Sequence, residues 1–258
     1  MRDNDFAPIA DSLRRRVLEF YAEHGERLDG AAGTNTLETN SGFVERRAAP
    51  LMEIINQSTG RGSIEGLRLL DLGCGFGALS VYFAAQGAIV TGVDPIESRL
   101  QVGSSVAAEH DLAAEFRHGW MEDLDLDDEA FDLAVQNNSL CYIVSREDRR
   151  AALAETRRVL KPGGSLAIRN PNRWNPLDQF TGLPLIHLFP PGQTARLAKL
   201  LGRPRSEVRL ASSPEATREL RQAGFVGVAH VASPASSWPA MMKPFARYQH
   251  LTARRPSD

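Results

Sequence analysis

The stretch "LRLLDLGCGFGALSVYFAAQGAIVTGVDP", residues 67–95, contains two carboxylates and two glycines that could bind a ligand. The carboxylates belong to Asp71 and Asp94, and the glycines are Gly73 and Gly75. Glycines let a backbone approach a ligand closely, and a carboxylate can accept hydrogen bonds from both hydroxyls of a ribose. Because Asp94 lies 21 residues after Gly73, the spacing predicts a binding turn for a cofactor that contains adenosine.

A strand, a tight turn and a helix must position these residues. The apolar run at 67–72 predicts a buried strand, and Leu79, Phe83 and Ala84 follow with the spacing of a helix face. A second apolar run at 88–93 leads into Asp94. The stretch is therefore predicted to be a βαβ unit, with the glycines in its first turn and an acid at the tip of its second strand.

The same alternation continues along the chain and predicts the fold class. Further strands are expected near 114–118, 131–136, 165–170, 226–231 and 247–253. Helices are expected over 14–24, 43–56, 98–110, 146–160 and 214–223. This order predicts an α/β fold with a Rossmann-like, doubly wound and mostly parallel seven-stranded sheet.

Two segments are predicted to be additions to this sheet. Residues 1–60 form an N-terminal helical lid or extension with a flexible loop at 28–42, and residues 61–258 form the Rossmann-like domain. Within that domain, residues 170–213 are an insertion after the fifth strand that begins with a loop rich in proline and aromatic residues. We expect this insertion to be a substrate cap, because α/β sheets bind ligands at the carboxyl ends of their strands.

Length and composition narrow the classes of function. A chain of 258 residues can bury a full core, and a formal net charge of -2 gives no general attraction for nucleic acid or anionic membranes. No apolar stretch approaches the roughly 20 residues of a membrane span. We expect Cys74 and Cys141 to be reduced thiols, and neither has another potential metal ligand at the usual sequence spacing. We expect a cytoplasmic protein without a metal, a nucleic-acid partner or membrane insertion, and a homodimer is compatible with the sequence.

The glycine turn alone would also fit an NAD-dependent enzyme. Asp71 argues against NAD, because its carboxylate would repel a pyrophosphate but attract the sulfonium and amino groups of S-adenosylmethionine. Four stretches then resemble, in order and spacing, the motifs of class I S-adenosylmethionine-dependent methyltransferases over residues 67–170. They are "LLDLGCGFG" at 69–77, "VTGVDP" at 90–95, "FDLAVQNNSLCYI" at 131–143 and "RRVLKPGGSLAI" at 157–168.

The resemblance implies a set of cofactor contacts. The methionine end would lie against the glycine turn and the fourth strand, the ribose against the second strand, and the adenine beside the turns that follow. The residues concerned are Asp71, Gly73, Cys74, Gly75 and Asn137 for the methionine end, Asp94 for the ribose, and Pro95, Ile96, Trp120, Met121 and Glu122 for the adenine. Trp120, in "HGWMEDLDL", departs from the family, whose members often have an acid there.

The acceptor is expected at the same edge of the sheet. Candidate contacts are Tyr21, Tyr142, Asn172, Trp174 and His187. If the acceptor is a hydroxyl that must lose its proton, His187 is the first candidate for the base and Asp178 the second, because histidine titrates near neutrality.

The sequence therefore predicts a methyltransferase that acts on a small molecule by in-line displacement, with an oxygen as the acceptor atom. Three alternatives stay open: N- or C-methylation of a metabolite, an NAD-dependent enzyme with the same turn, and a methyltransferase-like domain that only binds a partner. Methyltransferases of nucleic-acid bases often carry an Asn/Asp-Pro-Pro-aromatic tetrad after the fourth strand. Residues 137–140 read "NNSL" here, which disfavours that class.

Overall fold

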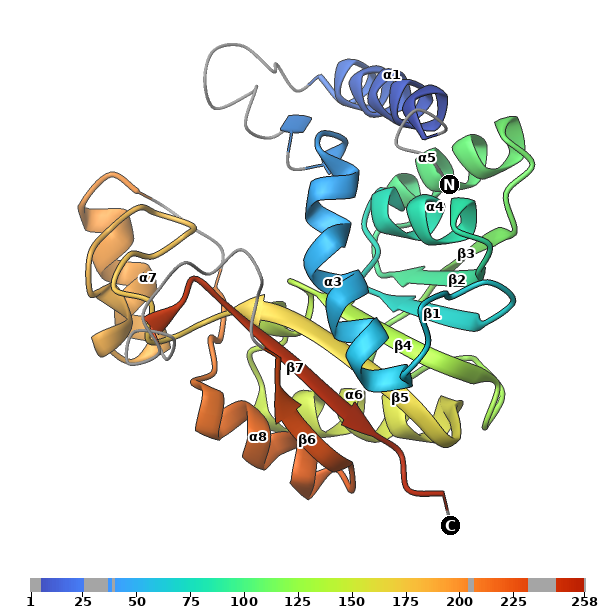
Figure 1. Cartoon of the computed structure of the whole chain (residues 1–258). Helices are drawn as coiled ribbons and strands as arrows, with labels where there is room; N and C mark the ends of the chain where they lie inside the picture. Colours follow the sequence, from blue (N-terminus) through green and yellow to red (C-terminus); the bar gives the residue numbers. More distant parts are fainter. Residues whose placement is uncertain (1–5, 26–36, 39, 204–206, 232–244, 258) are drawn as a thin grey trace.

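A computed structural model describes residues 6–25, 37–38, 40–203, 207–231 and 245–257, which fold around a seven-stranded sheet (Figure 1). The strands are β1 (Arg68–Leu72), β2 (Ile89–Asp94), β3 (Ala114–His118), β4 (Phe131–Asn137), β5 (Leu160–Pro171), β6 (Val226–His230) and β7 (Tyr248–Arg254). The α-helices are α1 (Ala7–Glu23), α3 (Val44–Thr59), α4 (Ala78–Ala85), α5 (Glu97–Glu109), α6 (Arg146–Val159), α7 (Pro191–Leu200) and α8 (Ser213–Gln222). Short 3₁₀ turns lie at η2 (Leu140–Tyr142) and η3 (Ile186–Leu188). None of the helices in these described ranges is long and apolar enough to cross a membrane.

The strand order is β3-β2-β1-β4-β5-β7-β6, and β7 is antiparallel to both of its neighbours while the other pairs are parallel. The predicted Rossmann-like, doubly wound fold is confirmed. The chain winds outward in one direction from β1 and in the other from β4, so the order reverses between these two strands. Ligands of such sheets bind at this reversal, outside the carboxyl ends of the strands.

Helices cover both faces of the sheet (Figure 1). Because side chains alternate along a strand, Leu69 packs into the cluster that includes α1, α3, α4 and α5, whereas Leu70 and Leu72 pack into the cluster with α6 and α8. Asp71 alternates onto the face of Leu69, where α4 supplies its partner Ser80. The strand that buries the core thus also aims one carboxylate at the first helix after the glycine turn.

The N-terminal helices are part of this layered arrangement. Helix α3 packs directly on β5 and β7, and α1 packs on α5. Phe6 and Leu13 of the N-terminal segment lie in the same buried cluster as the sheet residue Val135. The first 60 residues therefore share a hydrophobic core with the sheet, and the flexible loop predicted at 28–42 falls mostly outside the described residues.

Several predicted boundaries move. Helix α1 begins at Ala7, well before the expected 14–24, and β5 extends from Leu160 to Pro171. Helix α7 was not predicted, because its sequence, "PGQTARLAKL", follows a proline-rich loop. The proline at its start is compatible with a helix, since the first helical position needs no backbone N–H donor.

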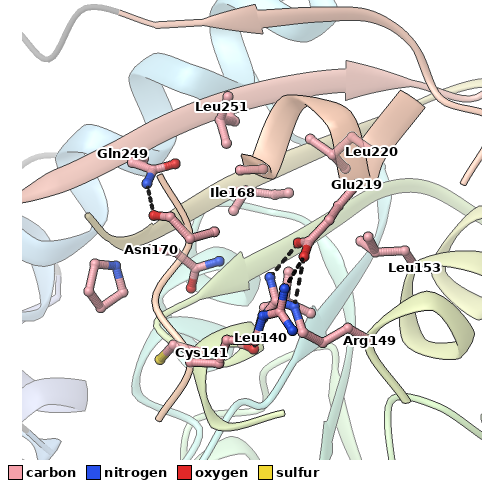
Figure 2. A pocket seen from close by; sticks show the side chains of 14 residues that line it. Leu140, Cys141, Arg149, Leu153, Ile168, Asn170, Glu219, Leu220, Gln249 and Leu251 are labelled. Atoms are coloured by element: carbon pink, nitrogen blue, oxygen red, sulfur yellow. Dashed lines mark hydrogen bonds and ion pairs between the residues drawn. The ribbon is translucent and has the colours of Figure 1, made fainter. Parts of the chain in front are cut away.

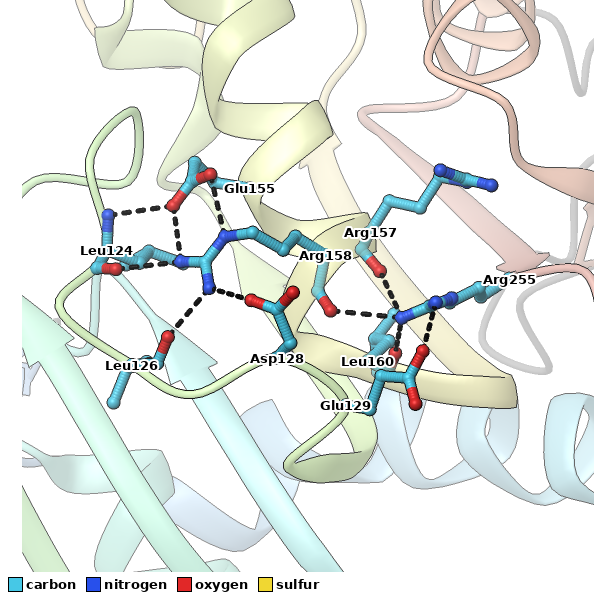
Figure 3. Close-up of polar contacts among 9 residues, drawn as sticks. All are labelled: Leu124, Leu126, Asp128, Glu129, Glu155, Arg157, Arg158, Leu160 and Arg255. Carbon is cyan, nitrogen blue, oxygen red and sulfur yellow. Dashed lines mark hydrogen bonds and ion pairs between the residues drawn. The ribbon is translucent and has the colours of Figure 1, made fainter.

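Ion pairs and hydrogen bonds to the backbone stabilise the loops at the amino ends of β4 and β5. Arg158 joins the loop before β4 to α6, and Arg255 joins the chain after β7 to the start of β5 (Figure 3). Their partners are Leu124, Leu126, Asp128 and Glu155 for Arg158, and Glu129, Arg157, Arg158 and Leu160 for Arg255. These contacts hold the amino ends of β4 and β5, which lie at the edge of the sheet opposite to the carboxyl ends where ligands bind.

Candidate active site

A cavity of about 430 Å³ lies at the carboxyl ends of β1 and β4. Its lining residues come from the glycine turn, the end of β4, the N-terminal segment around α3, the loop after β5 and the start of β7. They are Asn40, Arg47, Asp71, Gly73, Cys74, Gly75, Phe76, Ala78, Leu79, Asn137, Asn138, Tyr142, Gln179, Phe180, Arg247 and Tyr248. The volume lies within the range of small-molecule and cofactor sites.

The glycine turn gives the cavity its floor. Gly73 and Gly75 have φ angles of 74° and 57°, in the left-handed region that favours glycine. A side chain at Gly73 would lie 2.3 Å from Cβ of Ser139, so this position has no room for one. A side chain at Gly75 would meet nothing within 4 Å, because the position faces open space. One glycine therefore allows the turn to pack, and the other leaves space for a ligand.

Asp94 holds this turn in place. Its Oδ2 accepts a hydrogen bond from the Gly75 N–H at 2.9 Å, and its Oδ1 accepts one from the Ile96 N–H at 3.0 Å. The residue is buried, with 7% of its surface exposed. Each carboxylate oxygen has a second lone pair, so Asp94 can still accept hydrogen bonds from a ligand above the turn.

Asp71 is a buried carboxyl at the wall of the cavity. Ser80 Oγ donates a hydrogen bond to its Oδ2 at 2.7 Å. Burial raises the pKa of Asp71 to about 6, and the nearby charge of Arg47 acts in the opposite direction. Burial and the charges of Asp71 and Asp94 also raise the pKa of the Cys74 thiol well above its usual range, which disfavours a nucleophilic thiolate.

The cavity also has arginines in and beside its lining. Arg47 and Arg247 line the cavity, and Arg169 stands behind Tyr248 with its Cζ 3.6 Å from the ring centroid. Arg169 also donates a hydrogen bond to Asn137 Oδ1 at 3.1 Å. Burial lowers the pKa of both Arg47 and Arg169, and Arg169 lowers that of Arg47 further.

The structure brings together part of the predicted cofactor set. The residues of that set that line the cavity are Asp71, Gly73, Cys74, Gly75 and Asn137, joined by the predicted acceptor contact Tyr142. Asp94 and Ile96 lie beside the turn, linked through Ile96 N–H, with Pro95 between them. Met121 packs near Gly73, Glu122 is half-buried, and the Trp120 side chain is 56% exposed.

Other predicted residues lie outside the cavity lining. His187 and Asp178 are both buried and contact each other, with His187 Nε2 3.1 Å from Asp178 Oδ1. Asn172 is buried and accepts a hydrogen bond from the Trp174 backbone, while the Trp174 side chain is largely exposed. Tyr21 does not line the cavity but contacts a residue that does, since its hydroxyl accepts a hydrogen bond from Asn40 Nδ2 at 2.8 Å.

Sequence reasoning missed more than half of the cavity lining. The residues not predicted are Asn40, Arg47, Phe76, Ala78, Leu79, Asn138, Gln179, Phe180, Arg247 and Tyr248. Arg47 and Arg247 come from segments far from the motifs, and no local pattern marks them. Gln179 and Phe180 lie in the loop that we expected to cover the acceptor, but His187 was the residue predicted to act there.

A second hollow lies on the other side of β5 and β7, between α6 and α8 (Figure 2). It measures about 20 Å³, room for little more than a water molecule. Beside it, Arg149 binds Glu219 through an ion pair of 2.6 Å and donates to the Leu140 carbonyl (Figure 2). No cluster of three or more potential metal ligands occurs within the described ranges.

Comparison with known proteins explains the arrangement at β1 and β4. Residues 70–168, which include both acids of the glycine turn and the end of β4, match the family model of a methyltransferase domain. The chain carries a class I S-adenosylmethionine-dependent methyltransferase domain. This methyltransferase domain comprises β1 to β5, and the cavity lies partly on it and partly on the segments before and after it.

Two relatives and one solved structure illustrate the likeness of the methyltransferase domain. The chain is 36% identical over 116 residues to a ubiquinone biosynthesis O-methyltransferase of Maricaulis maris, covering 45% of this chain and 44% of that one. It is 40% identical over 105 residues to a demethylmenaquinone methyltransferase of Clavibacter sepedonicus, covering 41% of each. The match spans less than half the length of these curated relatives. A crystal structure of an S-adenosylmethionine-dependent methyltransferase from Mesorhizobium loti has a TM-score of 0.58 at 23% identity, covering 79% of this chain and 98% of that one, which shows the shared fold.

Proposed function

We propose that this protein transfers a methyl group from S-adenosylmethionine to an oxygen of a small-molecule acceptor. The observation that carries the proposal is the pairing of Asp71 and Asp94 around an open glycine turn at the strand reversal. The match to a methyltransferase domain and the names of the two relatives support methyl transfer to a small molecule, and the name of the first, an O-methyltransferase, supports oxygen as the acceptor atom. Cytoplasmic location and a homodimer stay predictions.

The residues of the cavity fit the two ends of the cofactor. Gly75 leaves open space above the turn, and Asp94 lies directly beneath it with lone pairs for the two ribose hydroxyls. Asp71 can accept hydrogen bonds from the ammonium group of the methionine end, and Arg47 can bind its carboxylate. The pairing is chemically matched, because Arg47 has a buried Nη1 without a hydrogen-bond partner among the described residues.

The adenine is assigned to the edge beside β2 and β3. Ile96 and Trp120 are both exposed there, with 39% and 56% of their surfaces accessible. An exposed indole can stack on a purine without any hydrogen bond to its amino group. We assign Trp120 this stacking role in place of the acid that related domains often have.

When bound, S-adenosylmethionine supplies an electrophilic methyl group on a sulfonium that is already a good leaving group. The chain's contribution is to position the acceptor in line with that methyl and to exclude water. Tyr142 and Phe180 are suited to this task, since both line the cavity and their rings meet edge to face at 6.3 Å. Tyr142 comes from η2 and Phe180 from the loop after β5.

A general base from the cap is not part of the proposal. His187 and Asp178 satisfy each other inside the cap, and neither lines the cavity. We assign the pair a structural role that holds the loop carrying Gln179 and Phe180. Methylation of nitrogen or carbon uses the same cavity and stays an alternative, which the identity of the labelled product decides.

Calorimetry and methyl transfer test the proposal together. S-adenosylmethionine and its demethylated product, S-adenosylhomocysteine, are expected to bind at one site per chain, whereas NAD is not. NAD is the necessary comparison because Arg47 and Arg247 could also attract a pyrophosphate. Tighter binding of NAD would overturn the assignment, and binding of S-adenosylmethionine without label transfer to any extract of small molecules would favour a partner-binding domain.

A further inference from the structure

Three guanidinium groups lie near Tyr248, a residue of the cavity lining. The Cζ atoms of Arg169 and Arg247 lie 3.6 Å and 5.5 Å from the Tyr248 ring centroid. Arg47 lines the same cavity and lies near this group, since the charges of Arg169 and Tyr248 both influence its pKa. No carboxylate within the described ranges forms an ion pair with any of the three arginines.

This gathering of positive charge is costly without a counter-charge. Burial lowers the pKa of Arg169 and of Arg47, and Arg247 acts further on Arg169 in the same direction. Arg47 Nη1 and Arg169 Nε are buried and have no hydrogen-bond partner among the described residues. Among the described residues that line the cavity, Asp71 is the one carboxylate, and of the three arginines its charge acts on Arg47. Buried charges of one sign normally occur where a ligand or partner neutralises them.

The cofactor does not provide the missing negative charge. Under the proposed function, the ammonium group of the cofactor pairs with Asp71 and its carboxylate pairs with Arg47. The sulfonium of the cofactor adds a further positive charge. The arginines at Tyr248 are then still uncompensated. β1 and β7 are three strand spacings apart in the sheet, roughly 14 Å at about 4.8 Å each, so Arg247 lies beyond the methionine end.

The backbone that carries Arg247 is firmly held. Asn172 N–H donates to the Arg247 carbonyl at 3.1 Å, and Asn172 Nδ2 donates to the Ala246 carbonyl at 2.9 Å. Tyr248 pairs in register with Pro171 at the end of β5. The Arg247 side chain, in contrast, is exposed at the cavity. A fixed backbone with an exposed guanidinium is an arrangement that can bind a planar anion with two hydrogen bonds.

We propose that Arg247, supported by Arg169 and Tyr248, binds a carboxylate on the methyl acceptor, which is a planar or aromatic acid. This inference rests on the proposed function and specifies the substrate class of the same cavity. The aromatic rings of Tyr142, Phe180 and Tyr248 provide flat apolar surface for the acceptor body. The carboxylate would anchor the acceptor at β7 and turn its nucleophilic atom toward the methionine end.

Binding of a matched pair of probes tests this inference apart from catalysis. The protein is first saturated with S-adenosylhomocysteine, and its binding by calorimetry reports on the proposed function alone. Benzoate and the isosteric, neutral benzamide are then titrated against that complex by ligand-observed NMR. We expect benzoate to bind about tenfold more tightly than benzamide, the scale of one charge-assisted contact. Equal affinity for the two probes, or failure of both to bind, would overturn the inference while leaving cofactor binding as evidence for the domain.

Variants locate the contact. Arg247→Gln should lower benzoate affinity about tenfold, leave benzamide unchanged and preserve S-adenosylhomocysteine affinity within about twofold. Arg221→Gln is the matched control, because it removes an exposed arginine of α8 outside the cavity. A preference for benzoate that survives Arg247→Gln, or that disappears equally in the control, would refute the assignment of Arg247.

Discussion

Replacement of Asp71 by asparagine should make the protein more stable and less able to bind its cofactor. Burial raises the pKa of the Asp71 carboxyl to about 6 from an ordinary value of 3.8. A carboxyl whose pKa is raised on folding binds its proton more tightly in the folded protein, so the free energy of unfolding falls as the pH rises through this interval. Above the folded pKa the full cost is about 3 kcal/mol, since each pKa unit corresponds to about 1.4 kcal/mol.

Asparagine removes this ionisation while keeping the shape of the side chain and an oxygen for Ser80 Oγ. The stabilisation by Asp71→Asn should therefore depend on pH, being about 3 kcal/mol at about pH 8 and smaller by about 1.4 kcal/mol at about pH 5. Urea unfolding of both proteins at the two pH values measures this difference. Changes in other carboxyl groups cancel, because they are common to both proteins.

Asp127→Asn is the control, since Asp127 is exposed and should give no pH-dependent difference. Affinity for S-adenosylhomocysteine should fall about tenfold in Asp71→Asn, because a charged acceptor for the ammonium group is lost. If the parent protein and Asp71→Asn lose stability in parallel from about pH 5 to about pH 8, the carboxyl is not desolvated as the structure indicates. Unchanged cofactor affinity would separately place the ammonium group elsewhere.

The other predictions concern the turn and the cap. Asp94→Ala should weaken cofactor binding by about 1.5 to 3 kcal/mol in calorimetry, and unaltered affinity would move the ribose site. Gly73→Ala should destabilise the protein by about 2 kcal/mol or more in urea unfolding, because its Cβ would lie 2.3 Å from Cβ of Ser139. Gly75→Ala should cost less stability, since its Cβ meets nothing within 4 Å, yet reduce cofactor affinity; the reverse ranking would contradict the geometry. His187→Ala should lower the free energy of unfolding by about 1 to 3 kcal/mol without changing the pH profile of methyl transfer, and a shifted profile would restore its role as a base.

The sequence by itself determined the sheet and the glycine turn. Both are local features, because the periodicity of strands and helices and the spacing of the glycines can be read from neighbouring residues. Asp71 and the end of β4 at Asn137 could be assigned to one edge for the same reason, since parallel strands place their carboxyl ends together. The fold class followed from that logic, whereas the five cavity residues assigned to the cofactor came from the resemblance of the motifs to class I methyltransferases.

Only the tertiary structure decided what faces the glycine turn. Arg47 reaches the cavity from a helix before the first strand, and Arg247 reaches it from the start of an antiparallel strand near the chain's end. Long-range packing of α3 and β7 against β5 brings these charges together, and no spacing in the sequence encodes that contact. In the loop after β5, His187 contacts the buried Asp178, while Gln179 and Phe180 line the cavity. A loop's composition predicts that it covers a site, whereas the direction of each side chain depends on partners that only the folded chain supplies.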